Sequence, residues 1–288
     1  MELKIKPIGK MIGGQDGAIY GDYLFRFKSR GHGYAYDLRE LGKKHTELSP
    51  IAEFDLDKSD VIAPHSNAVM FGTERYSEDD ELPLLYSNIY NNYAKCEDKL
   101  VGVTCVYRIT REGDGFVTKL VQLIEVGFTD DRELWRSAGD TEDVRPYGNF
   151  VIDRERGLFL GFVMRDAERR TRYFAFDLPH LCDGTYDERY GVRRVRLTPC
   201  DVKWQFDVPY HNFIQGAVCH GGKVFSVEGF GEKIHPALRV IDTESRCELL
   251  YRDLLLSGLP HEAEFIDFYR ERCIYSDAYG NMFELLFD

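Results

Sequence analysis

A short opening of small and polar residues occurs five times along the chain, and each time a turn and an apolar strand follow it. The openings are Gln15–Ala18, His65–Ala68, Tyr147–Phe150, Gln215–Ala217 and Glu262–Phe265. Each begins a unit of about 50 to 80 residues that is rich in β-branched and aromatic residues, the composition typical of strands. A repeated unit of three or four strands is how a β-propeller builds its blades. We therefore predict an all-β fold, a five-bladed β-propeller.

The fifth unit reaches the end of the sequence after three strands, the last of them Asn281–Phe287. Leu3–Met11 alternates in hydrophobicity and precedes the first unit without belonging to it. Pairing these two segments would remove the exposed edges of an open ring. We predict that the N-terminal strand closes the last blade and that residues 1–288 form a single domain. The third unit is predicted to contain the strands Phe150–Ile152, Leu158–Met164, Arg172–Leu178 and Arg193–Leu197.

Charge and hydropathy exclude several kinds of partner. The net charge is -12, whereas nucleic-acid binding and anionic membrane surfaces require clustered Lys and Arg. The sequence holds no apolar run long enough to cross a bilayer, and its first residues do not form a signal peptide. We therefore expect a cytoplasmic protein that binds neither nucleic acid nor membrane.

Metal and cofactor motifs are absent from the sequence. The 7 cysteines form no C-x-x-C pair and are expected to be reduced, with several buried inside strands. Asp55–Asp60 resembles a calcium loop but lacks its turn glycine and final glutamate. The 8 histidines show no metal-ligand spacing, and no Gly-rich turn suits a phosphate. We expect neither a metal nor a cofactor.

Polar residues at the five openings are predicted to converge on one mouth of the central channel, because the innermost strand of every blade lines that channel. This set comprises Gln15, His65, Asn67, Tyr147, Asn149, Gln215 and Glu264. A second set at the ends of the second strands would lie one layer further out, namely Arg26, Asn88, Arg165, Glu228 and Asp277. Their mixed signs suit a polyhydroxylated or zwitterionic ligand. Channel water, loop hydrogen bonds and salt bridges between blades would account for the same residues.

Three aromatic residues in the connections are candidates for the walls of a sugar site. Trp135 lies between two blades, Tyr90 begins an insertion in the second blade, and Trp204 lies in the segment Thr198–Phe206. That segment is a candidate short helix, with Thr198 as its cap and a proline in the first turn. Aromatic faces pack well against sugar rings. The alternative is that each tryptophan anchors its loop.

Catalysis by paired carboxylates would draw on the acids placed near the mouth, Glu264, Glu228 and Asp277. Such a pair must lie on opposite sides of a scissile bond. His65 is a candidate general base. The clustering of these acids in the fourth and fifth blades permits this chemistry without requiring it, and His65 could instead make structural hydrogen bonds.

Two stretches carry a resemblance to known families. Pro64–Gly72, together with Leu82–Ser87, resembles an uncharacterised group of bacterial five-bladed β-propeller proteins. Gln215–Gly216 and Val224–Gly229 are similar to single blades of the helveticin J group and its teichoic-acid-associated relatives. The first likeness implies the propeller fold over most of the chain, and neither implies a catalytic residue.

Three functions remain open at this point. The first is binding of a small polar ligand, such as a carbohydrate or another glycan, at the channel mouth. The second is a glycoside hydrolase or related carbohydrate-active enzyme, and the third is a scaffold that binds another protein. Two facing carboxylates in a deep pocket would favour the enzyme, and a flat apolar patch would favour the scaffold.

Overall fold

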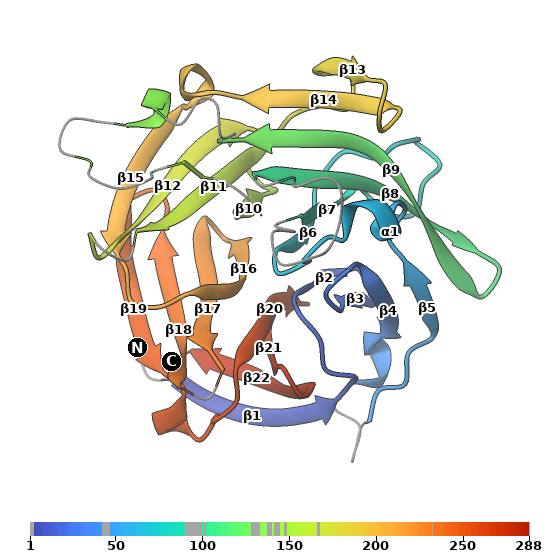
Figure 1. Cartoon of the computed structure of the whole chain (residues 1–288). Coiled ribbons are helices and arrows are strands. Elements are labelled where there is room, and N and C mark those ends of the chain that lie inside the picture. The colour runs from blue at the N-terminus through green and yellow to red at the C-terminus, as the bar shows by residue number, and fades with distance from the viewer. Residues whose placement is uncertain are drawn as a thin grey trace.

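The computed structural model describes residues 3–41, 47–89, 100, 102–127, 133–136, 140, 145–146, 149–165, 168–231 and 233–287. Five sheets are arranged in a ring around a common centre (Figure 1). The innermost strands β2, β6, β10, β16 and β20 contact one another in that order, and β20 returns to β2. The fold is therefore a five-bladed β-propeller, as predicted.

Each blade is a mostly antiparallel sheet that runs outward from its innermost strand. The first blade contains β2 (Gly17–Tyr20), β3 (Tyr23–Phe27), β4 (His32–Asp37) and β5 (Ala52–Asp55). The second begins with β6 (Val69–Phe71), β7 (Leu85–Asn88), β8 (Val103–Glu112) and β9 (Gly115–Val126). The third contains β10 (Phe150–Asp153), β11 (Leu158–Arg165), β12 (Arg170–Asp177) and β15 (Trp204–Pro209). The fourth contains β16 (Ile214–His220), β17 (Lys223–Phe230), β18 (Ile234–Asp242) and β19 (Cys247–Asp253). The fifth contains β20 (Ala263–Tyr269), β21 (Arg272–Asp277) and β22 (Asn281–Phe287).

The N-terminal strand completes the fifth blade. β1 (Leu3–Lys10) pairs antiparallel with β22, with Leu3 opposite Phe287 and Lys10 opposite Asn281. Its inward side chains Leu3 and Ile8 are buried. The predicted closure of the ring by the N-terminal strand is thus confirmed (Figure 1).

The outer strands of the second and third blades differ from the prediction. Arg193–Leu197 lies in β14 (Val192–Leu197), which pairs in parallel with β9 of the second blade and carries the short β13 (Thr185–Asp187) on its other side. β15 takes the fourth position of the third blade. The helix predicted for Thr198–Phe206 is wrong beyond its first turn, because Thr198 caps only the 3-10 turn Pro199–Asp201 and an alternating strand follows.

Helical structure is confined to single turns in the part of the chain that the structure describes. These turns are α1 (Ser59–Ile62), η1 (Leu38–Glu40), η3 (Pro199–Asp201) and η4 (Leu255–Ser257), together with a 3-10 turn at residues 133–135. None of the described helices is long and apolar enough to span a membrane.

The core lies between neighbouring blades, where the faces of two sheets meet. Phe25 of the first blade, for example, packs edge-on against Phe71 and Phe116 of the second, with ring centroids 5.5 and 5.0 Å apart. Burial of such aromatic faces, each worth a few kcal/mol, stabilises the ring at every blade boundary.

Side chains of one blade also satisfy the inner-edge amides of the next. Asp16 Oδ2 accepts a hydrogen bond from the Val69 amide at 3.0 Å, and Asp267 Oδ2 accepts one from the Ile19 amide at 2.7 Å. Buried amides need such partners. These contacts fix the angular position of adjacent inner strands, and with it the spacing of the residues at the strand openings.

Candidate ligand-binding site at the channel mouth

A pocket of about 670 Å³ lies where the five inner strands begin. Every blade or its entry segment contributes to it. The lining residues are Gln15, His65, Asn67, Asn149, Val163, Met164, Phe213, Ile214, Gln215, Phe230, Glu262 and Glu264. The structure thus brings together Gln15, His65, Asn67, Asn149, Gln215 and Glu264, which the sequence placed at the openings. Tyr147, the remaining member of that set, lies outside the described residues.

Two of the lining side chains are presented by β-bulges. Ile214 is opposite Glu228 and Gly216 is opposite Val227, so Gln215 is an extra residue in β16. Likewise Ala263 is opposite Asp277 and Phe265 is opposite Ser276, which makes Glu264 the extra residue in β20. A bulge interrupts the alternation of a strand and redirects one side chain. Gln215 and Glu264 therefore hold equivalent positions at the openings of adjacent blades.

Gly216 allows the two bulged strands to approach closely. A Cβ atom on this residue would lie 2.7 Å from the Glu264 carbonyl oxygen and 3.2 Å from Asp16 Oδ1. Because the nearest atom belongs to backbone, a side chain here would push the fourth and fifth blades apart. The sequence Gln215–Gly216 thus combines a polar side chain for the pocket with a residue small enough for the inner ring.

Glu264 is the most buried acid of the pocket, with 4% of its surface exposed. Its Oε2 atom has no hydrogen-bond partner among the described residues. Burial raises the pKa of this carboxyl to about 8, while the Arg26 guanidinium lowers it and Glu262 raises it further. At neutral pH the Glu264 carboxyl is therefore mostly protonated and can both donate and accept a hydrogen bond.

Arg26 stands next to Glu264 but does not line the pocket. It is fully buried, donates to the carbonyl oxygens of Gly14 at 2.9 Å and Asp277 at 3.4 Å, and lies 5.2 Å from the centroid of the Phe265 ring. Burial lowers its pKa from the usual value, and the nearby carboxylates oppose that shift. Its contacts link the first and fifth blades beneath the opening.

The second blade presents His65 and Asn67 through a hydrogen-bonded turn. The His65 amide donates to the Ile89 carbonyl at 2.7 Å, and Asn88 Oδ1 accepts from the amides of Asn67 and Ala68 at 3.1 and 3.2 Å. Asn88, which was expected in a second ring of ligand-binding residues, instead positions the opening. Burial lowers the pKa of His65, so its imidazole is neutral at pH 7.

Three lining residues were not predicted as site residues, namely Glu262, Phe213 and Phe230. Gln215 Nε2 donates to Glu262 Oε1 at 2.8 Å, which joins two openings. Phe213 and Phe230 are 42% and 59% exposed, and their ring centroids lie 6.1 Å apart. The available signal was adjacency, because Phe213 and Glu262 each lie two residues before a predicted site residue.

Two acids that were candidates for catalysis are engaged elsewhere. Glu228 is fully buried, forms an ion pair with Arg239 at 2.6 Å and accepts from the Asn212 amide at 3.2 Å. Burial raises the pKa of Glu228 to about 7. Asp277 accepts from the amides of Tyr279 and Asn281 at 3.0 and 2.9 Å and so shapes the turn before β22. Neither side chain is among the lining residues.

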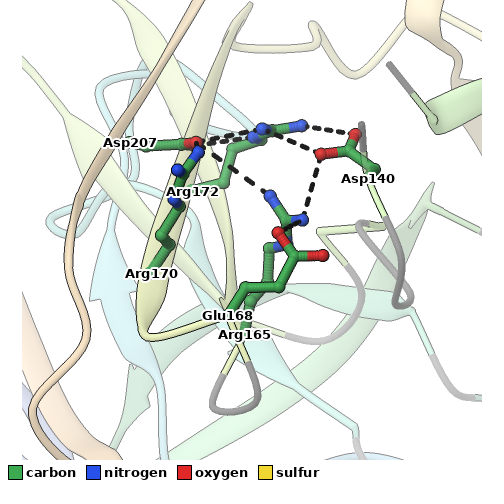
Figure 2. Close-up of polar contacts among 6 residues, drawn as sticks. All are labelled: Asp140, Arg165, Glu168, Arg170, Arg172 and Asp207. Atoms are coloured by element: carbon green, nitrogen blue, oxygen red, sulfur yellow. Dashed lines mark hydrogen bonds and ion pairs between the residues drawn. The ribbon is translucent and has the colours of Figure 1, made fainter. Parts of the chain in front are cut away.

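Arg165 belongs to a separate ionic network at the end of β11. Its guanidinium lies 3.0 Å from the Asp140 carboxylate and also pairs with Glu168 (Figure 2). The Arg172 guanidinium lies between two carboxylates, 2.9 Å from that of Asp140 and 2.6 Å from that of Asp207. This ionic network holds the residue Asp140, from the connection between the second and third blades, against the third blade. Arg165 directly follows the pocket residue Met164 but is not itself among the lining residues.

The tryptophans do not line the pocket. Trp135 is buried against Phe174 and Phe176, with ring centroids 5.5 and 6.2 Å away. Trp204 lies on the outer strand β15, where the Arg246 guanidinium is 5.5 Å from its ring. Both act as anchors of their segments. Tyr90 lies outside the described residues.

No group of three or more His, Cys, Asp and Glu side chains in the described ranges is arranged to hold a metal ion. The chemistry offered by the pocket is that of amides, one imidazole, two carboxyls and an apolar wall. Such a set can hydrogen-bond and transfer protons.

Comparison with known proteins gives the fold alone. No family model matches the sequence, and no curated protein matches it. The chain is similar in structure to the PQQ-bound aldose sugar dehydrogenase of Streptomyces coelicolor, with a TM-score of 0.50, 10% identity and coverage of 99% of this chain and 98% of that one. It is also similar to the glutaminyl cyclase of Myxococcus xanthus, with a TM-score of 0.47, 11% identity and coverage of 98% and 99%. The chain is therefore a β-propeller for which no sequence family is shown, and the likeness to helveticin J has no support.

Proposed function

We propose that the protein binds a small, hydroxyl-rich ligand, such as a carbohydrate, in the pocket at the channel mouth. The observation that carries this proposal is the pocket itself, to which all five blades or their entry segments contribute a polar side chain. A purely structural role would require these groups to satisfy one another. Glu264 Oε2 has no hydrogen-bond partner among the residues described.

Two kinds of lining group suit such a ligand, namely the side-chain amides and the apolar side chains. Amides donate and accept hydrogen bonds with equal ease, which is what a hydroxyl group requires. Val163, Met164 and Ile214, together with the rings of Phe213 and Phe230, supply an apolar wall. A sugar ring has a polar edge and an apolar face, and a pocket with few polar groups on an apolar surface is the usual form of a small-molecule site.

A ligand screen followed by substitution tests this proposal. Thermal shift with neutral sugars, polyols, sugar acids and amino sugars would identify a stabilising compound, whose affinity is then measured by calorimetry. Gln215→Ala and Asn149→Ala should each weaken binding about tenfold, because each removes hydrogen bonds inside the pocket. Gln205→Ala, on the exposed face of β15, is the matched control and should leave affinity unchanged.

Two results would contradict the proposal. One is an affinity that stays the same in Gln215→Ala and Asn149→Ala, which would locate the ligand elsewhere. The other is the absence of any stabilising compound across the whole panel.

A carbohydrate-active enzyme is the second candidate, and the observation that favours it is the raised pKa of Glu264 next to a second acid, Glu262. A carboxyl that is protonated at neutral pH suits a general acid. Glu264→Gln should then lower turnover by about a hundredfold or more while binding is retained. Absence of turnover in the wild-type protein, with binding intact, would leave the binding function alone.

A further inference from the structure

The described lining of the pocket carries two carboxyl groups, and its one basic side chain is the His65 imidazole, whose pKa is lowered by burial. Glu262 and Glu264 are among its lining residues, whereas no Lys or Arg of the described chain is. The guanidinium that acts on Glu264 is that of Arg26, which is fully buried beneath the opening and is not a lining residue; its Nη2 donates to two backbone carbonyls. A ligand in the pocket therefore meets carboxyl oxygens, and among the described lining residues no Lys or Arg is present to balance an anion.

Glu264 presents an acceptor that the described protein leaves unused. Its Oε2 is buried and without a hydrogen-bond partner in the described ranges, although the residue lines the pocket. A buried acceptor without a donor is costly, and a donor that carries a positive charge makes the strongest bond to it. A ligand that brings an N–H donor to this atom should therefore bind more tightly.

The apolar wall favours the same charge. Phe213 and Phe230 both line the pocket and are partly exposed, and their ring planes are inclined at 66°. The faces of aromatic rings attract cations and repel anions, because the ring quadrupole places negative charge above and below the plane. The carboxyl groups and the aromatic rings of the lining therefore both favour positive charge.

We propose that the pocket selects ligands that carry an ammonium group beside their hydroxyls, the class that includes amino sugars and amino polyols, over neutral and anionic analogues. This inference rests on the proposed function of the same pocket. Nothing covalent occurs in it, because the ammonium group keeps its protons and forms a charge-assisted hydrogen bond with Glu264.

Binding should then release a proton. The pKa of the Glu264 carboxyl, raised to about 8, leaves it mostly protonated at pH 7, and a bound ammonium stabilises the ionised form. The charged and titratable groups that act on Glu264 are Arg26 from β3, Glu262 from the same opening and Tyr275 from β21, and His65 lines the same pocket. Arg26 in turn faces Asp16, Tyr36 and Asp277. Affinity for an amine that stays protonated should therefore rise between pH 6.5 and 8.5.

Three matched probes test the selection by charge, namely 1-amino-1-deoxysorbitol, sorbitol and gluconate. Calorimetry at pH 8.5 should show the amine binding at least tenfold more tightly than sorbitol, and gluconate binding more weakly than both. At pH 7, titration of the amine in two buffers of different ionisation enthalpy should show release of about one proton per ligand. At pH 6.5 the advantage of the amine over sorbitol should shrink severalfold.

Glu264→Gln should abolish both the proton release and the dependence on pH, and Glu262→Gln should reduce the preference for the amine. Glu53→Gln, an exposed acid on the outer strand of the first blade, is the control and should change none of these values. Equal binding of the amine and sorbitol at pH 8.5, binding of gluconate at least as tight as that of the amine, or binding of none of the three would overturn the selection by charge. Those results leave the pocket itself to be judged by Gln215→Ala, so the two proposals can fail separately.

Discussion

The side-chain amide of Gln215 donates a hydrogen bond of 2.8 Å to Glu262 Oε1, which joins the openings of the fourth and fifth blades across the pocket wall. Gln215 is the bulged residue of β16, and Glu262 lies two residues before the bulged residue of β20. The bond orients one carboxyl of the pocket, while the other, on Glu264, keeps an oxygen available.

Protonation of Glu264 should make stability depend on pH. Its pKa is about 8 in the folded protein and about 4.3 in an unfolded chain. Between these values the folded state holds a proton that the unfolded state has released, so the free energy of unfolding falls as pH rises, by up to about 1.4 kcal/mol per pH unit. Glu264→Gln stays uncharged and should gain stability relative to wild type as pH rises from 5 to 8.5. Urea titrations at both pH values measure this difference, and parallel changes in the two proteins would argue against it.

The closing strand should stabilise the whole ring. Ile8 is buried between β1 and the first and fifth blades, and Ile8→Ala should lower the free energy of unfolding by about 2 to 4 kcal/mol through lost burial and a new cavity. Lys10→Ala, at an exposed position of the same strand, should cost less than about 0.5 kcal/mol. Deletion of residues 1–11 should expose the edge of β22 and lower the melting temperature by many degrees. A truncated protein that melts like the full chain would refute this role.

Asn88 should affect both stability and ligand affinity. Asn88→Ala leaves the buried amides of Asn67 and Ala68 without their acceptor, which should cost roughly 2 to 4 kcal/mol. It should also weaken ligand binding about tenfold, because the opening that carries His65 and Asn67 loses its support. Thr243→Ala removes a partly buried hydrogen bond to the Gly222 carbonyl, at the end of the fourth blade opposite its opening. This control should be less stable than wild type with unchanged affinity; an equal loss of affinity in both variants would mean that Asn88 acts only through global stability.

In the ionic network of Figure 2, substitution of a buried arginine should lower the free energy of unfolding more than substitution of an exposed one. The Arg172 side chain is 8% exposed and bridges Asp140 and Asp207. Arg172→Met leaves two carboxylates without their main cation and should cost about 3 to 5 kcal/mol. Arg170, 56% exposed and 3.4 Å from Asp207, is the matched position, and Arg170→Met should cost less than about 1 kcal/mol. Chemical denaturation at neutral pH compares them, and similar losses would show that burial does not determine the effect.

The strands of the blades could be predicted because each strand has a period of two in its own residues. The residues of an outer strand do not indicate which strand it pairs with. Arg193–Leu197 was correctly predicted as a strand and assigned to the wrong blade, since nothing in its residues indicates parallel pairing with Gln122–Val126. Thr198 was correctly predicted as a cap, yet local capping cannot specify the length of a helix when Trp204 and Val208 can pack as strand residues instead.

The pocket could be predicted in part for a similar reason. Residues at the openings converge because the topology forces the inner strands together, so Gln215 and Glu264 could be named from sequence. Asp277 could not be distinguished from them, because an acid that caps its own turn and an acid that faces a pocket occupy equivalent strand ends. Glu262 and Phe213 lie just before β20 and β16, outside the strands, where there is no alternation from which a place in the pocket could be predicted.

The parallel strand β14 has a consequence for how the chain is made. β9 ends at Val126 and β14 begins only at Val192, after three strands of the next blade have been synthesised, while β1 must wait for β22, the last strand of all. A chain emerging from the ribosome therefore carries an open edge on β1 while residues 11–280 are made, and a second open edge on β9 while residues 127–191 are made. Open edges are where nascent chains associate wrongly. Lys4, Lys6 and Lys10 place positive charge along β1, the strand whose edge stays unpaired longest. This charge disfavours pairing with another copy of the same strand.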